Sequence, residues 1–517
     1  MLKMVDGTGI IGVDMVCPLG GTVSPPQPPN YDNVEMEGVG SLMLPNSLKA
    51  PLERVELLGN SVQGENPAPD NPQEIKSAGR KSKNLFNIAD LRVGQVQKDG
   101  TINEKQIYYR TVILDVPQDG KYRITFNSND DYTMLYFTEA YANGAYSQPY
   151  LRVRAGSPNY YITLAKGKNI LSFSTHTASG KIVFTTDHNI MIAAESETLD
   201  YEPYGYLLDV KVTGKNLFDE SNVKKGYITV NDTIQNATEL RDEVYSDYIP
   251  VVYKSVLMTL QANIPQSEQL WSAIAFYTDD KTFIKRVAYN GLTGKSELKT
   301  KVEMMENARF IRVTYRRYGN GKMMINSGET YLPYEPYTEQ TLTLTSDRPI
   351  TKWDKLVKQG GEYGWLYQSA VDTDVKPSRL DLFPNGFSLF KDFGDGVYVY
   401  KVTNIKKAIG FQTSLCEQFK NKDGSYSTGD LFCYSDQPSM QMQYFVTDIP
   451  TLEEFKTWME ANPLTMVYKT TQAEFIPLPE SVQQQLQALH TENGITHVFV
   501  DSGEVPCGIK LTYRKEK

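Results

Sequence analysis

An internal repeat constrains the fold of this 517-residue chain more than any other feature. Lys83-Asn84-Leu85-Phe86-Asn87 recurs as Lys215-Asn216-Leu217-Phe218-Asp219, and Tyr201-Glu202-Pro203-Tyr204 recurs as Tyr334-Glu335-Pro336-Tyr337. The opening motifs start at residues 83 and 215, 132 residues apart, and the closing motifs at 201 and 334, 133 apart. Two markers that agree within one residue predict two tandem modules of similar size, over residues 83–204 and 215–337.

Each module has the pattern of a β-sandwich. Alternating apolar runs occur at 121–126, 132–137, 150–154, 160–164 and 169–174, and again at 248–253, 256–260, 272–277 and 310–315. Gly, Pro, Asn and Asp separate these runs, and no long stretch has the 3.6-residue period of a helix. About 120 residues of short strands with regular turns indicate a two-sheet sandwich of the jelly-roll type.

The repeated motifs bracket each module, and we expect its two ends to be adjacent in space. In this hypothesis the Leu and Phe of each opening motif plug the open end of the sandwich, and the Tyr pair of the closing motif packs over it. The glutamate between the tyrosines would then accept a hydrogen bond from the backbone or pair with Lys83 or Lys215. The bracketing residues with this structural role are Asn84, Phe86, Tyr201, Tyr204, Asn216, Phe218, Tyr334 and Tyr337.

The remaining segments differ from the modules. Residues 1–60 contain short strands and a Pro-rich spacer, and the polar, Pro-rich residues 61–82 are interpreted as a linker. Residues 351–517 predict a C-terminal α+β domain with two short helices. The first helix follows a capping-box pattern from Thr451 to Glu454 and carries Phe455, Trp458 and Met459 on one face. The second spans 479–491, with Val482, Leu486 and Leu489 on one face. The predicted fold class is therefore mainly β.

An acidic composition argues against a nucleic-acid partner. The chain carries 53 Lys and Arg against 62 Asp and Glu, a formal net charge of −9, whereas binding to phosphates needs clustered positive charge. The strongest basic cluster is Arg312, Arg316 and Arg317, which we interpret as the solvated face of a strand. No apolar stretch approaches the ~20 residues that cross a bilayer, and the N-terminus lacks the pattern of a signal peptide. We therefore expect no membrane association.

The four cysteines, Cys17, Cys416, Cys433 and Cys507, form no CxxC pair, so neither a zinc ribbon nor a redox motif is expected. In a reducing cytoplasm they would be free, buried thiols. A disulfide between Cys416 and Cys433, which are close in sequence, is the alternative.

No sequence motif for catalysis stands out. The patterns GxSxG, HExxH, GxxxxGK[ST] and GxGxxG are absent. The acidic pairs Asp130-Asp131 and Asp279-Asp280 are interpreted as turn residues, with a structural calcium ion as the alternative. We therefore expect a protein that is not an enzyme and has no cofactor. A glycosidase pair of carboxylates is an alternative that an acidic chain leaves open.

Aromatic residues give the best binding candidates. The segment 141–150, YANGAYSQPY, places Tyr141, Tyr146 and Tyr150 among small, turn-prone residues. Sugars stack on such rings, and Asn, Gln and Ser bond their hydroxyl groups. The segment therefore predicts a glycan-binding site, with the cover of a sandwich edge or a contact to a neighbouring subunit as alternatives.

Several segments together resemble the tail, baseplate and receptor-binding proteins of phages that infect Gram-positive bacteria. The linker GNSVQGENPAPDNPQEI (59–75) is similar to one common in these proteins, and KNLF and YEPY are the usual brackets of their carbohydrate-binding-like modules. SDYIPV (246–251), FYTDDKTFI (276–284) and ARFIRVTYR (308–316) look like internal strands of that module type. EEFKTWMEANPLTMVYKT (453–470) and LPESVQQQLQALHTENGITHVFVD (478–501) resemble the C-terminal region. Module 1 departs from the pattern because it lacks an SDYIPV equivalent.

The resemblance covers residues 41–517 in patches and implies a virion protein of the phage tail, made in the host cytoplasm. Residues 1–60 would dock to other tail or baseplate proteins, and the modules would contact wall polysaccharide of the host. The resemblance also implies a homotrimer, since such proteins are often trimers. The alternatives are a baseplate scaffold or adaptor, or a head fibre, that binds no ligand, and a wall-glycan depolymerase.

Overall fold

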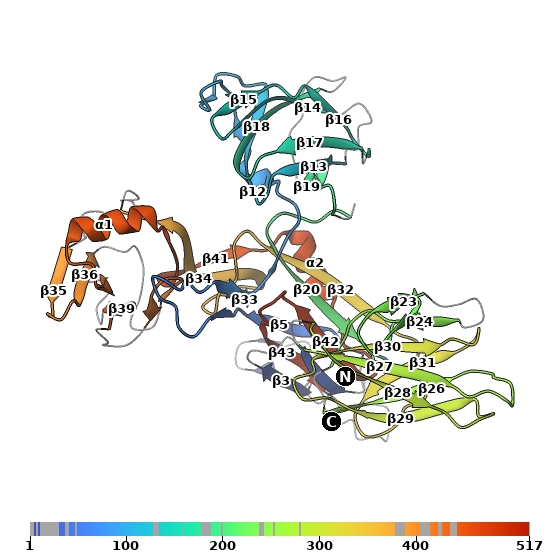
Figure 1. Ribbon diagram of the computed structural model, residues 1–517. Coiled ribbons are helices and arrows are strands. Elements are labelled where there is room, and N and C mark those ends of the chain that lie inside the picture. The colour runs from blue at the N-terminus through green and yellow to red at the C-terminus, as the bar shows by residue number, and fades with distance from the viewer. Residues whose placement is uncertain are drawn as a thin grey trace.

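The computed structural model describes residues 5–6, 9–10, 30–36, 41–46, 49–127, 134–157, 159–176, 188–197, 200–236, 242–251, 254–278, 281–377, 388–403, 414–421, 427–434 and 442–515. The fold is mainly β, with two α-helices near the C-terminus, and this confirms the predicted class. Three lobes project from a central β-structure, which we call the platform (Figure 1). Module 1 and module 2 are two of these lobes, and a C-terminal lobe that carries α1 is the third.

The platform consists of two sheets with α2 between them. One sheet has the order β32-β20-β42-β4, with β8 beside β20, and the other has the order β3-β43-β5-β33-β34-β41-β37. Their elements are β3 (Asn30–Met36), β4 (Ser41–Asn46), β5 (Leu52–Leu58), β8 (Arg80–Lys81), β20 (Tyr206–Thr213), β32 (Glu339–Ser346), β33 (Lys355–Gln359), β34 (Glu362–Val375), β37 (Ser414–Cys416), β41 (Leu464–Pro477), α2 (Glu480–Ala488), β42 (Gly494–Asp501) and β43 (Gly508–Lys515). Two small hairpins complete the N-terminal part, β1 (Val5–Asp6) with β2 (Gly9–Ile10) and β6 (Ser61–Gln63) with β7 (Ile75–Ser77).

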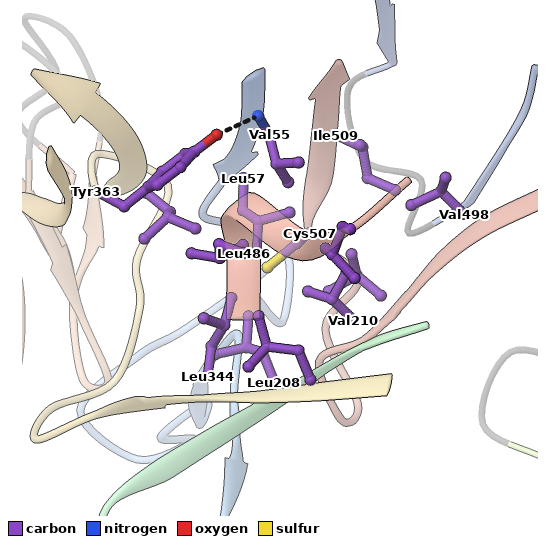
Figure 2. Close-up of a cluster of buried hydrophobic side chains, with 14 of the residues drawn as sticks. Val55, Leu57, Leu208, Val210, Leu344, Tyr363, Leu486, Val498, Cys507 and Ile509 are labelled. Atoms are coloured by element: carbon purple, nitrogen blue, oxygen red, sulfur yellow. Dashed lines mark hydrogen bonds between the residues drawn. The ribbon is translucent and has the colours of Figure 1, made fainter. Parts of the chain in front are cut away.

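The platform core draws its side chains from parts of the chain that are far apart in sequence. Figure 2 shows Leu57 of β5, Val210 of β20, Leu486 of α2 and Ile509 of β43 converging on one another, and all four are fully buried. The hydroxyl of Tyr363 accepts a hydrogen bond from the backbone N–H of Val55 at 3.2 Å in the same core. One core thus combines residues from the N-terminal segment, the linker and the C-terminal domain of the sequence analysis.

Module 1 is a two-sheet sandwich. One sheet has the order β15-β14-β18-β12-β9 with β16 beside β14, and the other has the order β17-β13-β19. Its elements are the 3-10 helix η1 (Ile88–Asp90), β9 (Arg92–Val93), β10 (Gln95–Val96), β11 (Ile102–Asn103), β12 (Tyr109–Val116), β13 (Gly120–Thr125), β14 (Met134–Ala142), β15 (Ala145–Ser147), β16 (Leu151–Arg154), β17 (Tyr160–Leu164), β18 (Gly167–His176) and β19 (Met191–Ala194). The first and last long strands of the larger sheet, β12 and β18, lie side by side, as in a jelly roll.

Module 2 repeats this topology. Its larger sheet has the order β21-β24-β30-β27-β28 with β25 beside β30, and its smaller sheet has the order β29-β26-β31. Its elements are β21 (Lys224–Lys225), β22 (Tyr227–Ile228), β23 (Ile234–Gln235), β24 (Glu243–Tyr245), β25 (Ile249–Pro250), β26 (Ser255–Gln261), β27 (Trp271–Tyr277), β28 (Phe283–Asn290), β29 (Glu297–Glu303), β30 (Phe310–Arg316) and β31 (Lys322–Ser327). In both modules a small hairpin, β10–β11 or β22–β23, lies on the outer side of the larger sheet. In module 1 the backbone N–H of Val96 in this hairpin donates to the hydroxyl of Ser172 in the sheet. In module 2 the backbone N–H of Ile228 donates to the hydroxyl of Thr314 in the same way.

The predicted brackets do bring the two ends of each module together. The side-chain amide of Asn216 donates to the carbonyls of Met323 at 3.3 Å and Glu335 at 3.0 Å. Its oxygen accepts from the backbone N–H groups of Phe218 at 2.9 Å and Ile325 at 3.1 Å. Asn216 therefore joins the opening motif, the last strand β31 and the closing motif, and it uses its whole hydrogen-bonding capacity.

Asn84 makes the same four hydrogen bonds in module 1, with Ile190, Glu202, Phe86 and Ile192. Each asparagine is only 2% exposed. The closing glutamates follow both expected alternatives: Glu202 accepts from the backbone N–H of Lys83, and Glu335 pairs with the side chain of Lys215.

The apolar bracket residues pack as expected, whereas the tyrosines cover the module ends only in part. Phe86 and Phe218 lie in the module cores, and the ring of Phe218 meets that of Tyr315 edge-on at 5.6 Å. Tyr201 and Tyr204 remain 40% and 38% exposed, and Tyr334 and Tyr337 are half-buried.

The C-terminal lobe grows out of the platform through β34 and β41, whose far ends pack in the core of the lobe. Its other elements are β35 (Ser388–Asp392), β36 (Tyr398–Thr403), β38 (Lys420–Asn421), β39 (Asp430–Tyr434), β40 (Met442–Thr447) and α1 (Leu452–Ala461). The hydroxyl of Thr451 caps α1 by accepting from the backbone N–H of Glu454, as predicted, and Phe455 and Met459 are buried.

One detail of the C-terminal predictions needs correction. The second helix ends at Ala488, earlier than the predicted residue 491, and it buries the polar side chain of Gln483 beside Leu486. Gln483 is tolerated there because its amide accepts from the backbone N–H of Tyr363 and donates to the carbonyl of Leu478.

Cys416 is a free, buried thiol, so the alternative of a disulfide with Cys433 is not observed.

Replacement of Asn216 by alanine tests the bracket. Asn216→Ala leaves two buried backbone N–H groups and two carbonyls without this partner, and each unsatisfied group costs about 1–3 kcal/mol. We expect the free energy of unfolding of module 2 to fall by roughly 3–5 kcal/mol, measured by urea denaturation. Asn231→Ala, at an exposed position in the same module, is the matched control. Equal stability of the two variants would contradict the assigned role.

Acid should weaken the junction between the platform and module 2. His497 of β42 is fully buried against Ser327 of module 2, and burial lowers its pKa to about 3 from its usual 6.5. The unfolded chain binds a proton that the folded chain does not, so stability should fall as the pH decreases from 6.5 towards 3. The expected slope is about 1.4 kcal/mol per pH unit. Urea denaturation from pH 7 to pH 4 should show this slope in the wild type, and it should be shallower in His497→Asn. Identical slopes would contradict the prediction.

Candidate functional site

The structure places the predicted tyrosine site on a β-hairpin. Tyr141 of β14 and Tyr146 of β15 are direct cross-strand partners, joined by a turn in which Asn143 and Gly144 both have positive φ. Tyr150 follows in the left-handed region and is 56% exposed. Burial, followed by the charge of Glu139, raises the pKa of Tyr146.

Tyr141 has one ring face already occupied. A Cβ atom on Gly100, in the turn of the β10–β11 hairpin, would lie 2.6 Å from Cε1 of Tyr141. The ring therefore packs against this turn, whereas Tyr150 is exposed and Tyr146, like Tyr141, is half-buried. The three tyrosines are neighbours, but they do not form a single open surface.

A better-formed site lies in module 2, on the outer side of its larger sheet. A cavity of about 330 Å³ is lined by Tyr227, Glu243, Gln269, Trp271, Arg286, Asn290 and Arg316. We call this cavity the module 2 pocket. An indole ring, a phenol ring, two guanidinium groups, a carboxylate and two amides line it, and this composition is typical of sites that orient a polar ligand.

Sheet register brings the lining residues together. Glu243 of β24 is the direct partner of Arg316 of β30, and Trp271 of β27 is the direct partner of Asn290 of β28. Ser272 pairs with Tyr315, which places Trp271 next to Arg316. Four strands thus contribute one row of side chains at the end of the sheet. The inward positions of β27, Ile274 and Phe276, lie in the module core.

Arg286 reaches this row because its neighbours are small. Arg286 is the cross-strand partner of Ala275. On the same face of the sheet, one further pair, Ala273 with Ala288, separates Arg286 from Trp271. These alanines leave room for the Arg286 side chain to lie along the sheet, where its guanidinium carbon stands 5.3 Å from the centre of the Trp271 ring. Burial lowers the pKa of Arg286, and the charge of Glu243 opposes this effect.

Arg316 is fixed from two sides. One terminal nitrogen lies 3.7 Å from the carboxylate of Glu243, which is buried, and the other donates to the hydroxyl of Tyr318 at 3.3 Å. That hydroxyl donates in turn to the carbonyl of Gln269 at 2.6 Å. Fixed donors on a rigid sheet are a property of binding sites, because little side-chain order has to be created when a ligand arrives.

The sequence interpretation of the basic cluster is wrong for Arg312. This residue is only 8% exposed, and it lies between the rings of Tyr245 and Tyr248, with its Nε donating to the carbonyl of Ser246. Arg317 does lie at the surface, where it pairs with Asp242. Arg312 and Arg316 alternate with the core residues Ile311, Val313 and Tyr315 along β30, a two-residue period that sequence alone could have revealed.

Module 1 carries a related but open arrangement. Tyr136 of β14 and Arg152 of β16 are direct cross-strand partners, and the guanidinium carbon of Arg152 stands 5.0 Å from the centre of the Tyr136 ring. Ser174 on β18 pairs with Tyr136 on its other side. An aromatic ring and an arginine thus occur on the same strand pair of both modules.

Two smaller cavities lie at the module junctions. One of about 190 Å³ is lined by Phe86, Tyr201 and Tyr204 of module 1 together with Thr345 of the platform. The other, of about 70 Å³, includes Tyr337 of module 2 and Phe499 of the platform. Three of the four bracket tyrosines, Tyr201, Tyr204 and Tyr337, therefore line the seams between modules and platform.

A metal site is not found in the described part of the chain. Within these ranges no group of three or more His, Cys, Asp or Glu side chains is arranged to hold a metal ion. The acidic pairs Asp130-Asp131 and Asp279-Asp280, considered for calcium, lie outside the described residues. None of the described helices is long and apolar enough to cross a membrane.

Comparisons with known proteins give no family. No family model and no curated protein matches the chain. A structure of the T13 viral particle of IBDV matches at 8% identity over 96% of this chain and 79% of that chain, with a TM-score of 0.14. An arabinofuranosyltransferase, AftD from Mycobacteria, matches at 10% identity over 79% of this chain and 32% of that chain, with a TM-score of 0.12. Similarities this low carry no argument about fold or function.

Proposed function

We propose that this chain is a structural protein of a bacteriophage tail, in the baseplate or a tail fibre, and that it attaches to glycans of the host cell wall through module 2. The observation that carries the attachment role is the module 2 pocket, where Trp271 stands among fixed polar groups on a rigid sheet. Sugars bind such sites because their apolar faces stack on an aromatic ring while their hydroxyl groups form hydrogen bonds.

The architecture supports this proposal. Module 1 and module 2 project from one platform as separate lobes (Figure 1), and the module 2 pocket is lined by residues of module 2 alone. The resemblance of the brackets and of the C-terminal segments to phage tail proteins gives the virion context. The proposed homotrimer would present several copies of each module, and multiple copies convert weak sugar affinity into avidity.

We propose that the protein binds glycans without cleaving them. The pocket contains one carboxylate, Glu243, and it is held close to Arg316. Hydrolysis of glycosides generally uses a pair of carboxylates on opposite sides of the scissile bond. Incubation with wall polysaccharide should therefore release no oligosaccharide, and release by the purified wild type would contradict this part of the proposal.

Binding of the labelled, full-length protein to cells of candidate Gram-positive hosts and to their extracted wall polysaccharide tests the attachment role. Trp271→Ala should weaken binding to wall oligosaccharides about tenfold or more, since truncation of a central aromatic contact costs on the order of 2 kcal/mol. Trp353→Ala in the platform is the matched control, and Tyr146→Ala tests the hairpin of module 1. Truncation before residue 83 is unsuitable, because it would remove β5 from the platform core.

Three outcomes are distinguishable once each variant is shown to melt like the wild type. Selective loss in Trp271→Ala supports attachment through module 2. Selective loss in Tyr146→Ala would move the site to module 1. A folded wild type that binds no cell and no polysaccharide of its true host would contradict attachment and favour a scaffold role in the virion.

A further inference from the structure

The charges around the module 2 pocket do not balance. Arg286 and Arg316 line it together with one carboxylate, Glu243. Arg316 lies 3.7 Å from Glu243, but Arg286 has no hydrogen bond and no ion pair with any of the described residues. One positive charge is therefore left without a partner, in a chain whose net charge is −9.

The described neighbours of the pocket on this sheet face do not compensate for the excess. Arg312 lies across Ala275 from Arg286, and Lys281 stands over the ring of Tyr248 at 5.4 Å. The carboxylate of Asp232 on the covering hairpin accepts a hydrogen bond from Tyr277 at 2.5 Å. Among the described residues around the pocket, three arginines and a lysine thus face two carboxylates, Glu243 and Asp232.

Arg286 makes a cation–π contact with Trp271 and no hydrogen bond with any described residue. Its Nε atom is buried and has no acceptor among the described residues, and the same is true of Nε of Arg316. A half-buried guanidinium without acceptors is unfavourable, because its donors have lost water without gaining a partner. A guanidinium stacked on a ring keeps its remaining N–H groups in its own plane, where they match the two oxygens of a carboxylate or a phosphate.

A neutral sugar would leave this charge uncompensated, whereas an anionic group would neutralise it. The volume of about 330 Å³ lies at the small end of ligand pockets, so the site has room for a short piece of a polymer. Trp271 and Arg286 are adjacent, so one ligand unit can place an apolar ring face near the indole and an anionic substituent near the guanidinium.

We infer that the module 2 pocket selects an anionic glycan, a sugar that carries a carboxylate or a phosphate group, with Arg286 as the residue that recognises the charge. This inference rests on the proposed glycan attachment and specifies its ligand. Carboxylate and phosphate share the same chemistry towards arginine, and chemical modification of the ligand separates them.

The test compares three forms of the wall polysaccharide from a host that the protein binds: native, carboxyl-reduced and phosphate-depleted by hydrofluoric acid. With the unmodified, full-length protein, one of the two treatments should weaken binding about tenfold or more, and it identifies the anionic group. Binding to the native polymer should also weaken between 50 mM and 500 mM NaCl, because salt screens the attraction. Equal binding to all three forms would overturn the inference and leave neutral-glycan attachment intact. Failure to bind the native polymer would overturn attachment itself.

A pair of variants assigns the effect to the pocket. Arg286→Gln should weaken binding to the native polymer about tenfold, because a charge-assisted contact is lost, and should weaken binding to the neutralised polymer much less. Lys285→Gln removes the same charge from the exposed neighbouring position and should bind like the wild type. Equal effects of both variants would show that net charge, and not Arg286, controls binding. The polymer comparison needs no variant, so it decides the inference even if Arg286→Gln does not fold.

Discussion

Each module is closed by the side-chain amide of one asparagine, and the arrangement of the molecule depends on this closure. Asn84 and Asn216 each join the first residues of a module to its last strand and to its closing motif through four hydrogen bonds. The two ends of the module are thereby held side by side. A domain with adjacent ends can be inserted between neighbouring strands of a sheet without disturbing their pairing. The chain enters module 1 from β8 and returns to β20 beside it, and it enters module 2 from β20 and returns to β32 beside it.

The two modules differ in how firmly they join the platform. Phe499 of β42 packs in the core of module 2, and His497 of the same strand stacks on Phe499 and contacts Ser327 of module 2. Among the described residues, the core of module 1 contains none from the platform, and Glu202 and Arg80 form an ion pair at its base. Module 2 is therefore joined to the platform through a shared hydrophobic core.

The sequence predicts the features that depend on residues close together in the chain. The repeat spacing, the alternation of apolar residues and the cap at Thr451 each involve residues within one module or one turn, and the structure has the corresponding elements. The platform could not be predicted because its strands pair across the length of the chain, as between Val34 of β3 and Leu511 of β43. The module 2 pocket was missed for the same reason. Trp271, Arg286 and Arg316 lie on different strands and meet only through the register of the sheet. The tyrosines of 141–150, by contrast, are close together in the sequence itself.

The central claim is that the outer face of module 2 is the attachment surface. Hydrogen–deuterium exchange of the full-length protein, with and without wall polysaccharide of its host, tests it directly because it locates the ligand without any substitution. Slower exchange confined to peptides from 269–290 and 310–318 is the result that the account predicts. Slower exchange in 141–150 of module 1, with module 2 unchanged, would contradict it.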